Sequence, residues 1–166
     1  MPASGARISI RSSFATVFAA LVALVAAAGA PAALAQSEGG LYIAGAGFSF
    51  QVAAERALSQ NAGGRRFFLL SVPPETAALL SRTTRPRAAL RDRVVAANGV
   101  LLVCQRDIDN GKLSATGLVA GVVAVRGWPP RGSTELPEGQ RYFANENPAN
   151  LPAANEALRQ LRSTCT

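Results

Sequence analysis

The sequence of 166 residues contains no histidine. This absence excludes Ser-His-Asp triads and other nucleophilic sites that use an imidazole base. It also excludes metal sites and pH switches built on imidazole groups. No other conventional hydrolase arrangement is visible, so the sequence does not predict a hydrolase.

Lysine is nearly absent as well, because Lys112 is the only lysine among 17 basic residues. The arginines are scattered along the chain rather than gathered in one basic block, and alanine is abundant. This composition is more typical of a GC-rich genome than of a nucleic-acid-binding surface. We therefore predict no nucleic-acid partner.

Two binding motifs are present only as fragments. A Gly-Ala-Gly turn at 45–47 follows a predicted strand, but Phe50 stands where a dinucleotide fingerprint needs its third glycine. Asp107 and Asp109 resemble the start of a calcium loop, yet Leu118 occupies the twelfth position, where glutamate is required. A plain tight turn and a solvated turn with helix-capping aspartates are favoured. The sequence predicts no metal and no cofactor.

Long apolar runs are missing except near the start of the sequence. Arg7 and Arg11 precede an uncharged apolar stretch, Phe14–Ala30, and an Ala-Leu-Ala cleavage site follows at 33–35. This three-part pattern predicts a secretory signal peptide over residues 1–35. An uncleaved membrane anchor is the alternative, but the stretch is barely long enough to span a bilayer.

Residues 36–166 are then expected to form a single mature domain, periplasmic or secreted, with no membrane segment after cleavage. Seventeen basic residues less the two in the leader leave fifteen, against ten acidic residues, so its net charge is near +5. A domain of this length can bury a hydrophobic core.

Hydrophobic periodicity predicts strands that alternate with helices. The expected strands are Leu41–Ala44, Arg65–Val72, Val100–Cys104 and Val119–Val125. The expected helices are Ser49–Asn61, Glu75–Ser81, Arg87–Asn98 and a final one from about Asn150, with 163–166 as a tail. This alternation predicts an α/β fold: a flavodoxin-like three-layer sandwich with a mostly parallel sheet. The proline-rich segment Pro129–Asn150 is either a functional loop or holds a short strand at Gln140–Phe143.

The residues at the carboxyl ends of the predicted strands form the best candidate site, because ligands of open α/β sheets bind there. The candidates are Cys104, with Ser71, Arg106, Arg126 and Trp128 as binding residues. Arginine near a thiol favours the nucleophilic thiolate, and a tryptophan can wall a pocket against water. The alternative is that Cys104 and Trp128 simply pack while the arginines are solvated.

Three states of Cys104 are open from the sequence. The first is a disulfide with Cys165, worth about 3–5 kcal/mol on the chain-entropy model. The second is a reactive thiol, for which Cys165 could act as the resolving cysteine. The third is an inert buried thiol. Two cysteines in an exported chain favour the disulfide.

The order of these elements, with Asn98-Gly99 before the run Val100–Cys104 and a later strand near Gly121–Val125, resembles the DsrE/DsrF-like sulfur-relay family. The resemblance covers about 41–128 and would make this chain an exported member. It implies a flavodoxin-like fold, frequent homo-oligomers and persulfide transfer at Cys104 without a cofactor. The implied partner is a protein or a small sulfur compound.

Two functions therefore remain as hypotheses. In the first, Cys104 is a catalytic thiol in sulfur or redox transfer, with Arg106 lowering its pKa and Trp128 and Arg126 shaping the pocket. In the second, the protein is a non-catalytic exported binding or interaction module with a structural Cys104–Cys165 disulfide. Whether the protein is an enzyme depends on whether Cys104 is paired.

Overall fold

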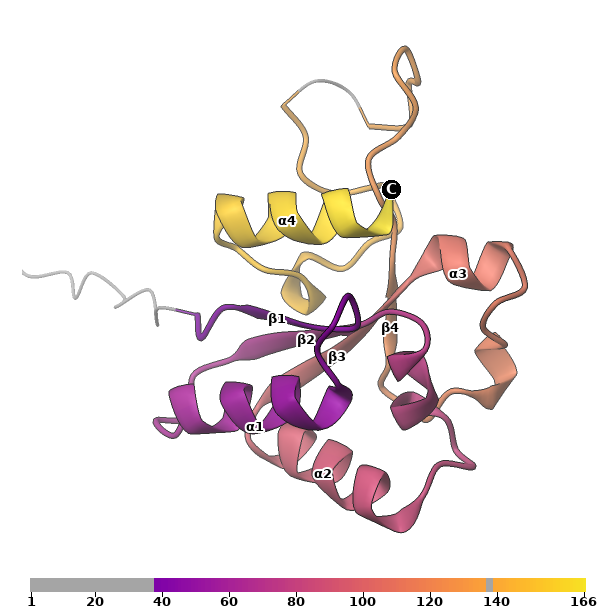
Figure 1. Cartoon of the computed structure of the whole chain (residues 1–166). Helices are drawn as coiled ribbons and strands as arrows, with labels where there is room; N and C mark the ends of the chain where they lie inside the picture. The colour runs from indigo at the N-terminus through magenta and orange to yellow at the C-terminus, as the bar shows by residue number, and fades with distance from the viewer. Residues whose placement is uncertain (1–37, 137–138) are drawn as a thin grey trace, which may run out of the picture. The chain divides into compact units, whose positions relative to one another are not determined.

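The computed structural model describes residues 38–136 and 139–166, so the predicted signal peptide lies outside the described residues. Within them, four strands form one sheet in which every neighbouring pair is parallel. The strands lie side by side in sequence order: β1 (Leu41–Ala44), β2 (Phe67–Ser71), β3 (Gly99–Cys104) and β4 (Val123–Val125) (Figure 1).

Helices cover both faces of this sheet (Figure 1). One face carries α1 (Phe50–Gln60), the 3-10 turn η1 (Glu75–Leu79) and α2 (Arg85–Ala96), and the other carries α4 (Asn155–Cys165). The shorter elements are α3 (Gln105–Asp109), η2 (Ala115–Gly117) and η3 (Pro148–Asn150). The predicted fold class is confirmed: this is an α/β protein with an all-parallel sheet, consistent with a flavodoxin-like three-layer sandwich.

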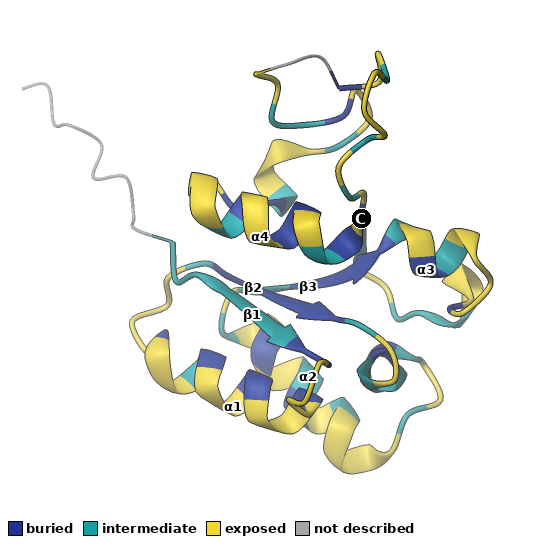
Figure 2. Ribbon diagram, turned by 45° about the horizontal axis from the view of Figure 1, so that its top comes forward, coloured by how far each residue is buried: buried dark blue, intermediate teal, exposed yellow. Residues whose placement is uncertain are grey.

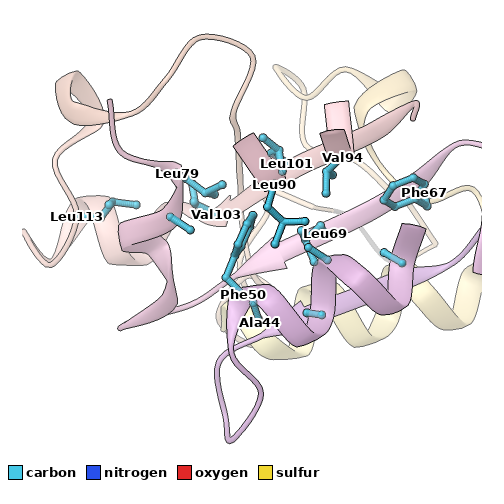
Figure 3. Close-up of a cluster of buried hydrophobic side chains, with 14 residues drawn as sticks. Ala44, Phe50, Phe67, Leu69, Leu79, Leu90, Val94, Leu101, Val103 and Leu113 are labelled. Carbon is cyan, nitrogen blue, oxygen red and sulfur yellow. The ribbon is translucent and has the colours of Figure 1, made fainter. Parts of the chain in front are cut away.

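The core is divided in two because successive strand side chains point to opposite faces. Phe67 and Leu69 of β2 pack in the cluster beneath α1 and α2, which Figure 3 shows with Val103 and Phe50. Phe68 and Leu70 pack in a second cluster beneath α4. β2 and the C-terminal part of β3 are buried throughout (Figure 2), as expected for central strands of a parallel sheet.

Local chemistry explains where the helices begin and end. The Ser49 hydroxyl caps α1 by accepting a hydrogen bond from the Val52 amide at 3.2 Å. Asn98 follows α2 with φ of 68°, a left-handed conformation typical of a helix C-terminus. A Cβ at Gly99 would lie 2.6 Å from Val94 and 2.7 Å from Phe67, so only glycine permits this tight step from α2 into β3.

Strand β4 is shorter than the predicted range Val119–Val125. Gly121 has a φ of 86°, which interrupts the extended backbone. The amide of Val119 donates to the carbonyl of Leu79 at 3.0 Å, outside the sheet. Three apolar residues remain to pair with β3.

The C-terminal part of the predicted layout needs two corrections, and one alternative that the sequence left open is excluded. Helix α4 begins at Asn155 rather than near Asn150, and it includes 163–165, which were predicted to be a tail. No strand forms at Gln140–Phe143, because the Phe143 amide donates to the Glu146 carboxylate at 3.1 Å instead of to a neighbouring strand. Among the described residues, no helix is long and apolar enough to cross a membrane.

Candidate functional site

Cys104 is disulfide-bonded to Cys165. The sulfur–sulfur distance is 2.04 Å and the Cα atoms lie 5.0 Å apart. Both residues are buried, with exposed fractions of 0% and 2%. Of the three states that the sequence leaves open, this structure contains the disulfide. The bond joins the C-terminal end of α4 to the end of strand β3 across a separation of 61 residues.

The amphipathic pattern of α4 brings Cys165 to this position. Leu158, Leu161 and Cys165 lie at i, i+3 and i+7, so they share one face of the helix. That face packs on Phe68 and Leu70 of the sheet. The sulfur of Cys165 is therefore carried into an apolar layer rather than to the solvent-facing side of the helix.

Three predicted binding residues come together at the carboxyl end of the sheet. Arg106, Arg126 and Trp128 line one recess of about 510 Å³, which also contacts Cys165 and Thr166. This convergence follows from the parallel arrangement, because β3 and β4 end at the same edge. The recess is named here the rim recess.

The polar groups of the rim recess hold residues of the chain itself. The Arg106 guanidinium donates to the main-chain oxygen of Thr166. The Trp128 amide donates to the Thr166 hydroxyl at 2.9 Å, and its indole nitrogen donates to the Ser163 hydroxyl at 3.3 Å. Arg126 lies 3.9 Å from the Glu135 carboxylate. Arg106 and Trp128 therefore hold the C-terminal end of α4, whereas the Arg126 side chain pairs with the segment that follows β4.

Gly127 allows the chain that follows β4 to approach the C-terminal end of α4 closely. A Cβ at this residue would lie 2.4 Å from both the carbonyl oxygen of Cys165 and the amide nitrogen of Thr166. A Cβ atom does not come this close to a non-bonded heavy atom, so a side chain at residue 127 would push α4 away from β4. The segment that leaves β4 thus runs directly against the helix end.

Ser71 does not line the rim recess. It closes β2, is fully buried, and its hydroxyl makes no hydrogen bond with the described residues. Asp107 also departs from expectation, because it is 2% exposed rather than part of a solvated turn. Its Oδ1 atom lies 3.7 Å from the Arg106 guanidinium.

The sequence reasoning missed a buried ion pair beside the rim recess. Arg162 of α4 is fully buried and binds Glu146 with both guanidinium ends, at 2.8 Å and 2.6 Å. The same guanidinium donates to the carbonyls of Arg126 at 2.9 Å and Arg141 at 2.6 Å. The two-pronged geometry is the strong form of a charge-assisted pair.

Phe143 contacts two arginines in this cluster. The Arg162 guanidinium carbon is 5.0 Å from its ring centroid, and that of Arg126 is 5.1 Å away. Glu146 also accepts from the Arg126 and Phe143 amides, at 3.4 Å and 3.1 Å. Phe143 and Glu146 therefore hold part of the Pro129–Asn150 segment against α4, so that segment has a structural role.

One signal in the sequence could have revealed Arg162. It lies four residues after Leu158 and immediately after Leu161, on the buried face of an amphipathic helix. A buried arginine requires a partner. The partner itself, Glu146, comes from a segment without periodicity, so the pattern alone could not identify it.

The described residues contain no group of three or more His, Cys, Asp or Glu side chains that could hold a metal ion. Comparison of the chain with protein-family models, with curated proteins and with solved structures finds no match. The resemblance to the DsrE/DsrF-like family therefore stays a prediction.

Proposed function

We propose that this protein is an exported, non-catalytic binding or interaction domain in which the Cys104–Cys165 disulfide is structural. The observation that carries the proposal is the burial of both sulfur-bearing residues, at 0% and 2% exposure, within an apolar layer. Thiol exchange requires a sulfur that an attacking thiolate can reach. A buried disulfide is a poor substrate for that attack.

The surroundings of Cys104 support the same conclusion. The first hypothesis gave Arg106 the role of stabilising a Cys104 thiolate, but its guanidinium hydrogen-bonds Thr166. Trp128 likewise donates to Ser163 and Thr166. Arg106 and Trp128 thus hold the C-terminal end of α4 in place, which is a structural role.

Export is part of the proposal and rests on the leader pattern at residues 1–35. Disulfides persist in the periplasm and outside the cell, whereas cytosolic thiols are kept reduced. The disulfide in this structure agrees with an oxidising compartment. A fusion of the leader to a reporter enzyme that is active only after export would test this part directly.

Thiol counting tests the central claim. Protein recovered from the exporting host is treated with a thiol-alkylating reagent and weighed by mass spectrometry, with and without reductant and denaturant. We expect no labelling of the native protein and two labels after reduction and unfolding. A Cys165→Ser variant is the control, because it leaves Cys104 as a free thiol.

Sulfur or thiol transfer is the second candidate function, favoured by the place of Cys104 at the carboxyl end of β3 and by Cys165 lining the rim recess. It requires that a dithiol partner first supply two electrons to open the disulfide. This function would be established, and the structural proposal overturned, by one accessible thiol that accepts the outer sulfur of a persulfide donor. The Cys104→Ser variant should lack that thiol.

A further inference from the structure

Strand β1 has a free edge. It pairs with β2 on one side and is the outermost strand of the described sheet. The carbonyls of Gly40 and Ala44 accept hydrogen bonds from the Phe68 and Val72 amides, at 3.0 Å and 2.9 Å. Main-chain groups alternate in direction along a strand, so those of Leu41 and Ile43 point away from β2, and such an edge is a template for another strand.

A groove along this edge is lined by residues of β1, α1 and α4. Figure 2 shows β1 at the edge of the sheet, with α1 on one side of the sheet and α4 on the other. Its volume is about 560 Å³. Phe48 and Val52 line it and are 56% and 51% exposed. They are two of the four large apolar side chains that are exposed among the described residues. Gln160 of α4 lines the opposite lip.

The groove carries a single charge among its described lining residues. Arg56 supplies it, and its guanidinium has no hydrogen-bond or ion-pair partner among the described residues. The neighbouring carboxylates are engaged elsewhere. Glu38 accepts from the Ala153 and Ala154 amides, at 2.7 Å and 3.3 Å, and Glu55 accepts from Gln51 at 3.0 Å.

From these three observations we infer that the β1 edge binds an extended segment of a partner protein, which adds to the sheet as a strand. The segment carries apolar side chains that cover Phe48 and Val52 and a carboxylate that pairs with Arg56. Main-chain bonds to Leu41 and Ile43 supply affinity, and the groove supplies selectivity. The inference rests on the proposed function and names the surface and the partner class.

Charge decides between this partner and a second copy of the chain. A copy docked edge to edge would present its own Arg56 and Gln60 along the groove rather than a carboxylate. Like charges that meet across an interface oppose association. An acidic segment avoids this repulsion and pairs with the exposed Arg56 guanidinium.

Peptide binding tests the inference. The probes are fluorescein-labelled peptides of alternating valine and threonine, with one glutamate placed at each position in turn. A matched set carries lysine in place of glutamate, and a third set has N-methylated main-chain amides. Binding to the full-length protein, as processed by the exporting host, is measured by fluorescence anisotropy.

We expect the glutamate set to bind, the lysine set to bind at least about tenfold more weakly, and N-methylation to abolish binding. Arg56→Glu should weaken binding of the glutamate set about tenfold and restore binding of the lysine set. Val52→Asn should also weaken binding. Arg82→Glu and Val95→Asn are the matched controls, since both residues are exposed outside the groove.

Three results would overturn the inference: no binding by any peptide, equal affinities for wild type and Arg56→Glu, or a reversible dimer that Val52→Asn dissociates. The dimer would identify a second copy as the occupant. Thiol labelling of the same samples separates the two claims. Labelling of the native protein would contradict the structural disulfide. If the native protein is not labelled and does not bind the peptides, only the proposed binding at the β1 edge is contradicted.

Discussion

At the scale of single residues, the most demanding feature is the charge of Arg162 inside the protein. Moving a guanidinium from water into an apolar interior costs several kcal/mol unless its donors are satisfied. Here Glu146 and two main-chain carbonyls provide acceptors, although the Nε atom has no partner among the described residues. The pair therefore makes the position of each partner depend strongly on the other.

Glu146→Ala should lower the free energy of unfolding by about 3–5 kcal/mol, because it leaves Arg162 buried without its countercharge. Urea unfolding followed by circular dichroism measures the change. Glu156→Ala is the matched control: Glu156 pairs with Arg159 at 3.1 Å on the surface, and losing this pair should cost less than about 1 kcal/mol. If the two substitutions lower the free energy of unfolding equally, the buried pair contributes no more to stability than the surface pair.

A double variant separates burial from pairing. Glu146→Leu combined with Arg162→Met removes both charges and keeps apolar volume, so it should recover much of the stability that Glu146→Ala loses. If the double variant is less stable than Glu146→Ala, the hydrogen bonds to the Arg126 and Arg141 carbonyls matter more than the charge pair.

At the scale of elements, helix α4 is held at both of its ends by residues distant in sequence. Near its N-terminus the Glu38 carboxylate accepts from two main-chain amides, at 2.7 Å and 3.3 Å. Negative charge at a helix N-terminus is stabilising because the first amides point outward without partners. The C-terminal end is held by the Cys165 disulfide and by contacts to Trp128.

Glu38→Gln should lower the free energy of unfolding by about 0.5–2 kcal/mol, because it weakens two charge-assisted hydrogen bonds to the main chain just before α4. Chemical denaturation measures the loss, and amide exchange should locate the loosening in the first turn of α4. Glu55→Gln is a suitable control, because Glu55 is an exposed residue whose carboxylate bonds Gln51 alone among the contacts described. Unchanged exchange in α4 would contradict the role of Glu38.

These anchors also explain which elements could be predicted from the sequence. β2 and β3 are short apolar runs bounded by turn residues, so their local pattern was sufficient, and their ranges were nearly right. The start of α4 was placed too early because the segment that leads into it is held by Glu38, which lies 115 residues away from Ala153. The candidate site was foreseen only in part, since strand ends converge by topology while the Arg162–Glu146 pair depends on a loop without periodicity.

At the scale of the whole molecule, the sheet separates two apolar layers of different origin. The layer under α1 and α2 is built largely from residues close in sequence to β1, β2 and β3. The layer under α4 depends on a helix that is joined to the sheet through the Cys104–Cys165 bond and the Phe143 cluster. The two layers should therefore differ in how they respond to reduction.

Removing the disulfide should loosen the α4 layer first. The double variant Cys104→Ala, Cys165→Ala should lose about 3–5 kcal/mol of stability, as the chain-entropy model gives for a loop of this size. Hydrogen exchange should show faster opening in α4 than in α1 and α2. Uniform acceleration across all helices would mean that the protein unfolds as one unit and that the disulfide does not selectively hold α4.

If the chain is exported as proposed, the same bond has a consequence for the order in which its parts emerge. A chain that leaves the secretion channel N-terminal end first presents Cys104 well before Cys165, which follows 61 residues later. During this interval Phe68, Leu70 and Leu102 have no α4 to cover them, although α1 and α2 can already pack on the opposite face. On the proposed export route, the nascent domain would thus pass through a half-covered stage with an unpaired thiol, open to chaperones and to thiol oxidases.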